Sequence, residues 1–202
     1  APGGAFPSAT YNPIDVQEPR PDYLAVARRA LEHIEANEGI YITTSLVGYY
    51  MARDLPEDMP VTALVNSVTI AEALRKKMNV SVILLGGEMS HRGHCHDFYT
   101  IQMVKGIRID KAFLSHAALS LDFGASIHDS AGVAFGRAVM ESSSVNIGLY
   151  PSSKTGRHSV HSVCRMTDYD FVITDSNVSE DFLMQGRELG AVIEVVDVKG
   201  GE

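Results

Sequence analysis

Short apolar segments alternate with amphipathic ones along most of this chain. The strand-like runs are residues 39–43, 61–65, 80–85, 111–115, 145–150, 171–174 and 192–196. Helix-like segments lie between them, at 46–55, 67–77, 98–105, 133–142 and 180–189. Repeated strand-then-helix order predicts crossover connections, and therefore an α/β fold with a mostly parallel sheet flanked by helices on both faces.

The first 21 residues differ from the rest. They contain five of the eight prolines and lack periodicity, which indicates an extended arm or linker. A helix is predicted to begin at Pro21 and Asp22 and to end before Gly39, because apolar residues recur at helical spacing at Leu24, Ala27, Leu31 and Ile34. The chain is therefore divided into an arm, residues 1–21, and one folded domain, residues 22–202.

Composition narrows the class of protein. The chain has 202 residues, of which 45% are hydrophobic and 21% charged, as in an ordinary globular domain. Its formal net charge is −8 and its 17 Lys and Arg residues are scattered, so direct binding of nucleic acid by this domain is not expected. Two distant cysteines, Cys95 and Cys164, and the lack of a signal peptide or long apolar span indicate a reducing cytoplasm, without membrane contact.

Polar loops follow several predicted strands. Parallel α/β sheets bind small ligands at the carboxyl ends of their strands, so these loops are the candidate site. Backbone N–H groups at helix starts favour an anion, although Thr44, Ser45 and Ser67 could simply cap helices. Lys154 could pair with a phosphate or carboxylate, or be a solvated turn residue. Gly86 and Gly87 could allow close approach of a ligand, or only form a tight turn.

Two segments are rich in metal-ligating residue types. One contains His91, His94, Cys95, His96 and Asp97, and the other contains His158, His161 and Cys164. Neither spacing matches a structural zinc motif, and on a strand His158 and Cys164 would face away from His161. Polar pocket lining or surface histidines are therefore favoured over a metal site, and no metal or cofactor is predicted.

Catalytic motifs are not found. The sequence has no nucleophile elbow, complete P-loop or dinucleotide fingerprint. The acids Glu88, Asp97 and Asp129 have no spacing that indicates general acid–base work. The residues alone therefore predict an α/β domain with a pocket suited to an anion.

A series of short motifs adds a family resemblance. In chain order they are 40–42 (Ile-Tyr-Ile), 52–56 (Ala-Arg-Asp-Leu-Pro), 65–67 (Val-Asn-Ser), 84–88 (Leu-Leu-Gly-Gly-Glu), 109–114 (Ile-Asp-Lys-Ala-Phe-Leu), 152–154 (Ser-Ser-Lys) and 173–175 (Ile-Thr-Asp). Together they resemble the C-terminal sensor domain of DeoR-type transcription regulators, over about residues 22–196. Residues 3–5 (Gly-Gly-Ala) resemble the end of the winged DNA-binding head of that family.

The resemblance implies a fold shared with ribose-5-phosphate isomerase, glucosamine-6-phosphate deaminase and CoA transferases. It implies a receptor for phosphorylated sugars that forms homodimers or homotetramers and contacts DNA only through a separate N-terminal domain. Effector binding would alter how the paired heads engage the operator, and the domain would not be an enzyme.

Several positions depart from the family pattern. The usual Asp-Ser-Gly-Thr-Thr-like loop is here Thr-Thr-Ser-Leu-Val at 43–47, and Asp97 stands where glycine is common. Ala134 and Gly136 replace an acidic and a basic residue, and Pro151 replaces an Asp. A phosphate beside Asp97 without a compensating cation would be costly. The usual phosphosugar would then be bound differently, replaced by another ligand, or not bound, and the extra histidines would donate to an unusual effector.

Three hypotheses follow. The first is a sensor for a sugar, polyol or sugar phosphate, with effector-binding residues Thr43, Thr44, Ser45, Leu46, Val47, Asn66, Ser67, Gly86, Gly87, His94, His96, Asp97, His116, Asp129 and Lys154. The second is a phosphosugar isomerase or deaminase in which Lys154 and Asp129 move protons. The third is an oligomerisation module that has lost ligand binding.

Overall fold

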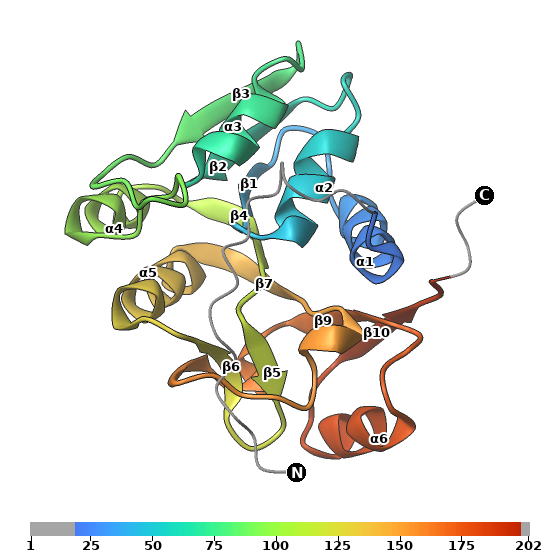
Figure 1. Cartoon of the computed structure of the whole chain (residues 1–202). Coiled ribbons are helices and arrows are strands. Elements are labelled where there is room, and N and C mark those ends of the chain that lie inside the picture. The colour runs from blue at the N-terminus through green and yellow to red at the C-terminus, as the bar shows by residue number, and fades with distance from the viewer. Residues whose placement is uncertain (1–18, 199–202) are drawn as a thin grey trace.

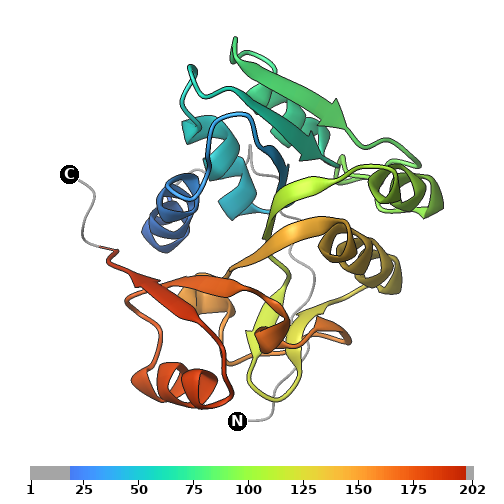
Figure 2. The same ribbon diagram turned by 180° about the vertical axis from the view of Figure 1, so that it is seen from behind.

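Seven parallel strands form the central sheet of the computed structural model, which describes residues 19–198 (Figures 1 and 2). Across the sheet the strand order is β10-β9-β7-β4-β1-β2-β3. The strands are β1 (Gly39–Ile42), β2 (Val61–Val65), β3 (Val80–Leu84), β4 (Ile109–Leu114), β7 (Ser143–Leu149), β9 (Phe171–Asp175) and β10 (Ile193–Val196). Every neighbouring pair is parallel, so all carboxyl ends meet at one edge.

Six α-helices of the described residues cover the sheet. They are α1 (Pro21–Leu31), α2 (Leu46–Asp54), α3 (Val68–Leu74), α4 (Phe98–Lys105), α5 (Ser130–Glu141) and α6 (Glu180–Glu188). Two 3-10 turns, η2 (Ser152–Lys154) and η3 (Met166–Asp168), lie in the connections between later strands. The predicted α/β class, with a parallel sheet between two layers of helices, is confirmed.

The alternation of side chains along each strand produces two separate cores. Ile40 and Ile42 of β1 pack in the core beneath α1, α2 and α3. Tyr41, between them, points to the other face, where it joins residues of α4, α5 and α6. Near-continuous apolar strands are what a sheet buried on both faces requires.

A second, antiparallel sheet was not predicted. It has the order β5-β6-β8 and consists of β5 (Ala118–Ser120), β6 (Gly124–Ile127) and β8 (His161–Cys164). The strands have only three or four residues, with sequences such as Gly-Ala-Ser-Ile, and so they carry little apolar alternation. Gly124 has φ +73°, and a Cβ there would lie 2.1 Å from the Cys164 carbonyl oxygen, so the close approach of β6 and β8 needs glycine.

Some predicted boundaries are wrong. The helix expected over 67–77 ends at Leu74, and the Lys77 ammonium beyond it donates to the carbonyls of Arg53 and Leu55 at the end of α2. The first helix ends at Leu31, and Ile34 reaches the core from the turn that follows. α5 begins at Ser130, three residues earlier than expected, because Asp129 caps it.

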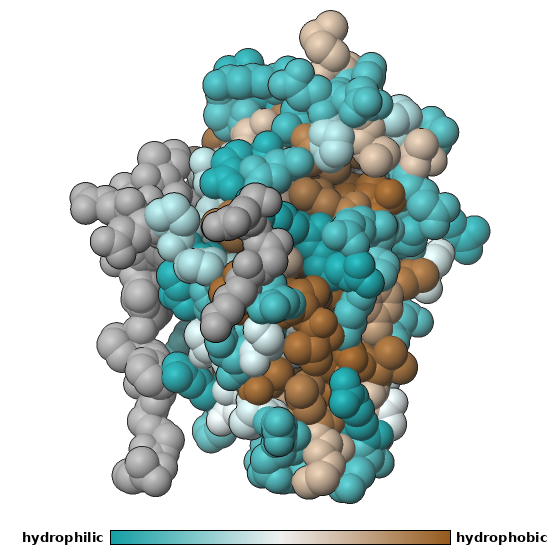
Figure 3. Space-filling model, turned by 90° about the vertical axis from the view of Figure 1, so that its right-hand side faces the viewer, coloured by the Kyte–Doolittle hydropathy of each residue, from teal (hydrophilic) through white to brown (hydrophobic). Residues whose placement is uncertain are grey.

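Both edges of the sheet expose apolar side chains. On the side that carries α1, α6 and β10, apolar residues come to the surface between hydrophilic ones (Figure 3). Val192 and Val195 at the β10 edge are 62% and 38% exposed, and Leu84 at the end of β3 is 44% exposed. None of the helices formed by residues 19–198 has the length and hydrophobicity needed to cross a bilayer.

Candidate functional site

The chain changes direction across the sheet between β1 and β4. From β1 it proceeds outward to β2 and β3, and from β4 it proceeds the other way to β7, β9 and β10. Such a switch point opens a crevice at the carboxyl ends of the two strands. Thr43 spans this point: its hydroxyl donates to the Ser115 carbonyl at 3.2 Å and accepts from the Ser115 N–H at 3.2 Å.

The loop after β1 is largely engaged in the protein's own contacts. The Thr44 hydroxyl donates to the Asn66 side chain at 2.7 Å, and the Ser45 hydroxyl caps α2 by accepting from the Gly48 N–H. The side chains of Leu46 and Val47 pack in the core. Leu46 and Val47 thus stand where the family pattern has two hydroxyl residues, and the remaining hydroxyls of Thr44 and Ser45 are hydrogen-bonded within the protein.

Asn66 connects the loops after β1, β2 and β3. Its carboxamide oxygen accepts from Tyr41 and Thr44, and its nitrogen donates to the Cys95 carbonyl at 2.7 Å. Asn66 and the neighbouring Ser67 are both only 3% exposed. The polar atoms of the Asn66 side chain are therefore used in hydrogen bonds that hold the three loops together.

Asp97 has a structural role at the β3 side of the edge. Its carboxylate caps α4 by accepting from the backbone and hydroxyl of Thr100, and it also accepts from the Glu88 N–H at 2.9 Å. The hydrogen bond from Glu88, followed by those from Thr100, lowers the pKa of Asp97 to about 2. A Cβ on Gly87 would lie 2.1 Å from this carboxylate, so the charged group fills the space beside Gly87, whereas Gly86 borders open space.

His94, His96 and Asp129 come together from distant segments. The two imidazole rings lie 5.0 Å apart, and His96 Nε2 is 3.5 Å from an Asp129 carboxylate oxygen. Burial, then the neighbouring His96, lowers the pKa of His94. The His94 Nδ1 atom is buried without a hydrogen-bond partner among the described residues. Asp129 also caps α5 through the Gly132 N–H at 2.6 Å.

The candidate metal ligands are dispersed. Over residues 19–198, no three His, Cys, Asp or Glu side chains gather in a group that could hold an ion. His91 is exposed, His161 is exposed on β8, and Cys95 and Cys164 are free thiols.

His116 belongs to a buried network that sequence reasoning did not find. Its Nδ1 lies 2.9 Å from the Tyr150 hydroxyl and 3.1 Å from that of Tyr169, and the two hydroxyls are 2.8 Å apart. Burial, aided by the charge of Lys154, lowers the pKa of His116 to about 4. Gly136 leaves room for this ring, since a Cβ there would lie 3.0 Å from His116 Nε2. Glycine at position 136, where the family pattern has a basic residue, therefore makes room for the His116 imidazole.

Lys154 reaches from the turn after β7 to the end of β4. Its ammonium donates to the Ser115 hydroxyl at 2.8 Å and to the His116 carbonyl at 2.9 Å. Both partners are neutral, so the positive charge is not compensated by them. Burial, then repulsion from Arg20, lowers the pKa of Lys154 to about 8.

A cavity of about 290 Å³ opens beside Lys154. Its wall comes from the start of α1, the loop entering β5, and the turns around residues 128 and 153–159. The lining residues are Arg20, Tyr23, Ala117, Ala118, His128, Ser153, Lys154, Arg157, His158 and Ser159. Sequence reasoning missed most of them. Arg20 lies in the segment that was assigned to the arm. Arg157 directly follows the Ser-Ser-Lys-Thr-Gly turn, and this second cation close to Lys154 in sequence could have indicated that it belongs to the same site.

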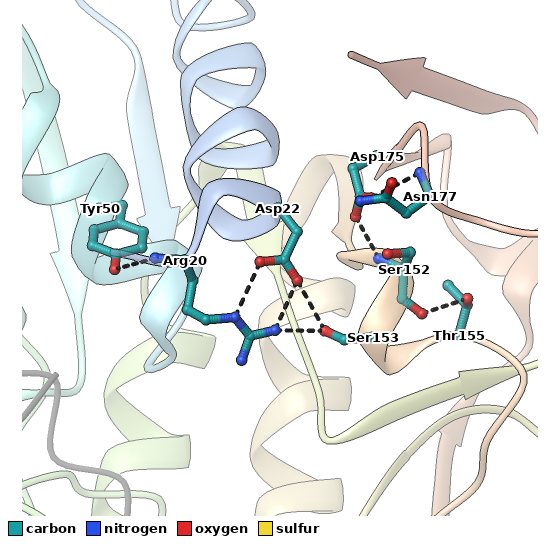
Figure 4. Close-up of polar contacts among 8 residues, drawn as sticks. All are labelled: Arg20, Asp22, Tyr50, Ser152, Ser153, Thr155, Asp175 and Asn177. Carbon is teal, nitrogen blue, oxygen red and sulfur yellow. Dashed lines mark hydrogen bonds and ion pairs between the residues drawn. The ribbon is translucent and has the colours of Figure 1, made fainter. Parts of the chain in front are cut away.

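The turn that carries Lys154 is fixed from two sides, as Figure 4 shows. The Ser152 N–H donates to the buried Asp175 carboxylate at 2.6 Å, and the Asn177 N–H donates to the same group at 3.0 Å. The Ser153 hydroxyl donates to Asp22 at the start of α1 at 3.2 Å. Asp22 in turn holds the Arg20 guanidinium through two hydrogen bonds.

The predicted site residues thus share one edge of the sheet but not one pocket. Lys154 follows β7 and Gly86 follows β3, with β4, β1 and β2 between these strands. At a strand spacing of about 4.8 Å, the carboxyl ends of β7 and β3 are roughly 19 Å apart.

A parallel sheet with a switch point, polar loops at its carboxyl edge and a cation-lined cavity there defines an α/β domain suited to binding a small polar molecule. The chain belongs to the family described as the DeoR C-terminal sensor domain, whose model matches residues 23–176.

Curated relatives agree with this family, and a solved structure shares the fold. The chain is 26% identical over 175 residues to the putative aga operon transcriptional repressor of Escherichia coli O157:H7, covering 85% of this chain and 64% of that protein. It is 24% identical over 152 residues to the glycerol-3-phosphate regulon repressor of Escherichia coli K12, covering 75% and 60%. The fold is similar to that of the translation initiation factor eIF-2B of Pyrococcus horikoshii OT3, with a TM-score of 0.51, 10% identity and coverage of 75% and 62%. The chain spans less than two thirds of the length of these relatives.

Proposed function

We propose that this domain is the effector-binding part of a transcription regulator and that its effector is a small carbohydrate or carbohydrate phosphate. The observation that carries the proposal is the arrangement of Thr43, Ser115 and Lys154 at the switch point between β1 and β4, beside a cavity of about 290 Å³. Hydroxyls and an ammonium group are suited to a ligand with several hydroxyls and an anionic end.

The effector would contact only part of the predicted set. Thr43, Thr44 and His116 follow β1 and β4 at the switch point, and Lys154 lines the cavity. Gly86, Gly87 and Asp97 lie at the far end of the edge, where the carboxylate of Asp97 disfavours an anion. His94, His96 and Asp129 would border the site from the α4 and α5 side.

DNA binding would reside in another part of a longer protein. The two relatives are named as repressors, and each extends well beyond the matched region. Effector binding need only favour one arrangement of the whole regulator over another, by about 1 to 3 kcal/mol of coupling free energy.

Catalysis is not part of the proposal. An isomerase would need Lys154 and Asp129 to act on one substrate. Among the described contacts, Lys154 donates to Ser115 and His116, whereas Asp129 caps α5 and faces His96. Within residues 19–198, no hydrogen bond or ion pair joins Lys154 to Asp129.

A thermal-shift screen of neutral sugars, polyols and sugar phosphates tests the proposal. A ligand at one hundred times its Kd adds about 2.7 kcal/mol to the free energy of unfolding. We expect at least one compound to stabilise the wild-type domain and to stabilise Lys154→Met less, with the exposed-lysine variant Lys76→Met as the control. Absence of any stabilising compound would favour the oligomerisation module, and turnover of a bound compound would favour the enzyme.

A further inference from the structure

Helix α4 is apolar on the side that faces solvent as well as on the side that faces the core. Thr100 and Val104 are fully buried, and Ile101 packs against the core that α4 shares with α5 and α6. At about 100° per residue, the opposite side of the helix consists of Phe98, Tyr99, Gln102 and Met103, all of them exposed. A surface helix normally has charged or polar residues on that side.

Four apolar side chains on and beside this helix are strongly exposed. Phe98 and Tyr99 are 68% and 69% exposed, Met103 is 41% exposed, and Met89, in the loop before the helix, is 60% exposed. The rings of Phe98 and Tyr99 meet edge to face, with their centroids 5.8 Å apart. We call these four side chains the α4 face.

The loop that carries Met89 is held against the start of α4. Met89 forms an antiparallel bridge with Cys95, and the Glu88 N–H donates to the carboxylate of Asp97, the residue that caps α4, at 2.9 Å. Helix α4 lies at the periphery of the molecule next to α5 (Figures 1 and 2), and no helix or strand of residues 19–198 covers its outer side.

Helix α6 shows the usual arrangement for comparison. Its solvent side has one apolar residue, Met184, among polar and charged ones, which are Glu180, Asp181, Gln185, Arg187 and Glu188. In α4 the only charged residue is Lys105, in the last turn. Aromatic residues and methionine are enriched in protein interfaces, from whose centres charged residues are depleted, so the α4 face has the composition of an interface.

We propose that the α4 face binds the α4 face of a second copy of this chain, with the two helices antiparallel about a two-fold axis. Such an interface is self-complementary. Phe98 of each copy packs on Met103 of the other, and Tyr99 packs beside Gln102. The pairing does not depend on which effector the domain binds.

The area of the α4 face agrees with a homodimer. Aromatic side chains have about 150 to 250 Å² of surface, so Phe98 and Tyr99 leave roughly 270 Å² uncovered, and the two methionines bring the α4 face to roughly 400 Å². A standard interface buries about 800 Å² on each partner, of which about 65% is apolar in homodimers. The four side chains therefore supply most of the apolar area that one such interface needs.

Charges at the two ends of the helix favour the antiparallel orientation. The exposed Lys105 lies in the last turn of α4, whereas the exposed Glu88 lies beside its first turn. In an antiparallel pair, Lys105 of each copy lies close to Glu88 of the other, so two ion pairs flank the apolar centre. The two helix dipoles are also opposed, whereas a parallel pair would bring like charges together.

Sedimentation velocity of the complete chain over a range of concentrations tests the pairing. We expect the wild type to associate and Met103→Glu to raise the dissociation constant by about tenfold or more, because a carboxylate is then buried against Phe98 of the second copy. The matched control is Met184→Glu, which makes the same change at a position of α6 that is 55% exposed, and it should leave the dissociation constant unchanged. Thermal unfolding of both variants verifies that they fold.

A charge exchange tests the antiparallel orientation. Lys105→Glu and Glu88→Lys should each weaken association by roughly threefold or more, and the double variant should recover wild-type association, because both ion pairs are restored with their signs reversed. Double-variant association no stronger than that of the single variants would overturn the antiparallel pairing.

Three further results would overturn the proposal. One is a wild-type chain that keeps the mass of one copy at every concentration, which would leave the α4 face to a different partner. Another is association of Met103→Glu as tight as that of the wild type. The third is equal weakening by Met103→Glu and Met184→Glu, since the effect would then come from added charge rather than from the α4 face.

Discussion

At the scale of single residues, the site is shaped by polar groups that are buried in an uncharged state or held by fixed partners. His116 is the clearest case, because its Nδ1 contacts two tyrosine hydroxyls and its backbone carbonyl accepts from the ammonium of Lys154. A charged imidazole there would be desolvated and repelled by Lys154, so the neutral form is favoured.

This environment predicts a pH-dependent stability. The pKa of His116 is about 4 when folded and 6.5 in its ordinary state, so the unfolded chain takes up a proton first as pH falls. The free energy of unfolding should therefore decrease between about pH 6.5 and pH 4, by up to about 3 kcal/mol from this residue. Urea denaturation across this range should show a flatter profile for His116→Gln than for the wild type. Parallel profiles would contradict the assignment.

At the scale of elements, the loops of the edge are positioned by tight contacts between a strand end and the helix that follows. Gly48 in the first turn of α2 shows this, since a Cβ there would lie 1.9 Å from the Thr43 carbonyl oxygen. Helix α2 can approach the end of β1 only because residue 48 has no side chain.

Gly48→Ala should therefore force α2 away from Thr43 and cost about 1 to 3 kcal/mol of stability. Chemical denaturation measures this cost. Gly86→Ala is the matched control, because a Cβ at Gly86 would meet no atom within 4 Å and should change stability little. Equal stability of the two variants would show that the close contact is unimportant.

The turn of Lys154 depends on Asp175 in the same way. This carboxylate is 0% exposed and accepts two backbone N–H groups, from Ser152 and Asn177. Asp175→Asn replaces one acceptor oxygen by a donor and should cost about 1.5 to 3 kcal/mol. It should also weaken binding at the cavity, because the turn is no longer fixed. Asp58→Asn, at an exposed position, is the control for loss of charge, and loss of stability equal in both variants would argue against the anchoring role.

Sequence reasoning succeeded for the long elements and failed for the short ones. The strands of the main sheet, such as Val61–Val65, are nearly continuous runs of apolar, mostly buried residues. Their sequence pattern therefore indicates a strand directly. Strands β5, β6 and β8 are formed by residues such as Ser120, Ser126 and Ser162, whose pairing depends on tertiary contacts.

The same distinction explains the site. The loops that directly follow apolar strands, such as those that contain Asn66 and Lys154, could be placed at the carboxyl edge of the sheet from the sequence alone. Arg20 and Arg157 could not, because their convergence depends on how α1 packs beside the turn after β7, and no local pattern encodes that contact.

At the scale of the whole molecule, the exposed apolar side chains at both sheet edges bear on assembly. Edge strands with exposed valines or leucines, such as Val195 and Leu84, are commonly covered by another chain. We expect the domain to form homodimers or homotetramers. Sedimentation velocity at several concentrations should give a mass above that of one chain of 21.9 kDa, and a single species of that mass at every concentration would contradict this expectation.

The central claim is that a small polar effector binds at the carboxyl edge of the sheet where β1 and β4 meet. Amide chemical-shift mapping, with the compound that most stabilises the domain, tests this claim most directly. The shifts should concentrate on residues 43–45, 115–118 and 153–158. Shifts that concentrate at the opposite edge of the sheet, near the starts of β1, β2 and β4, would contradict the claim.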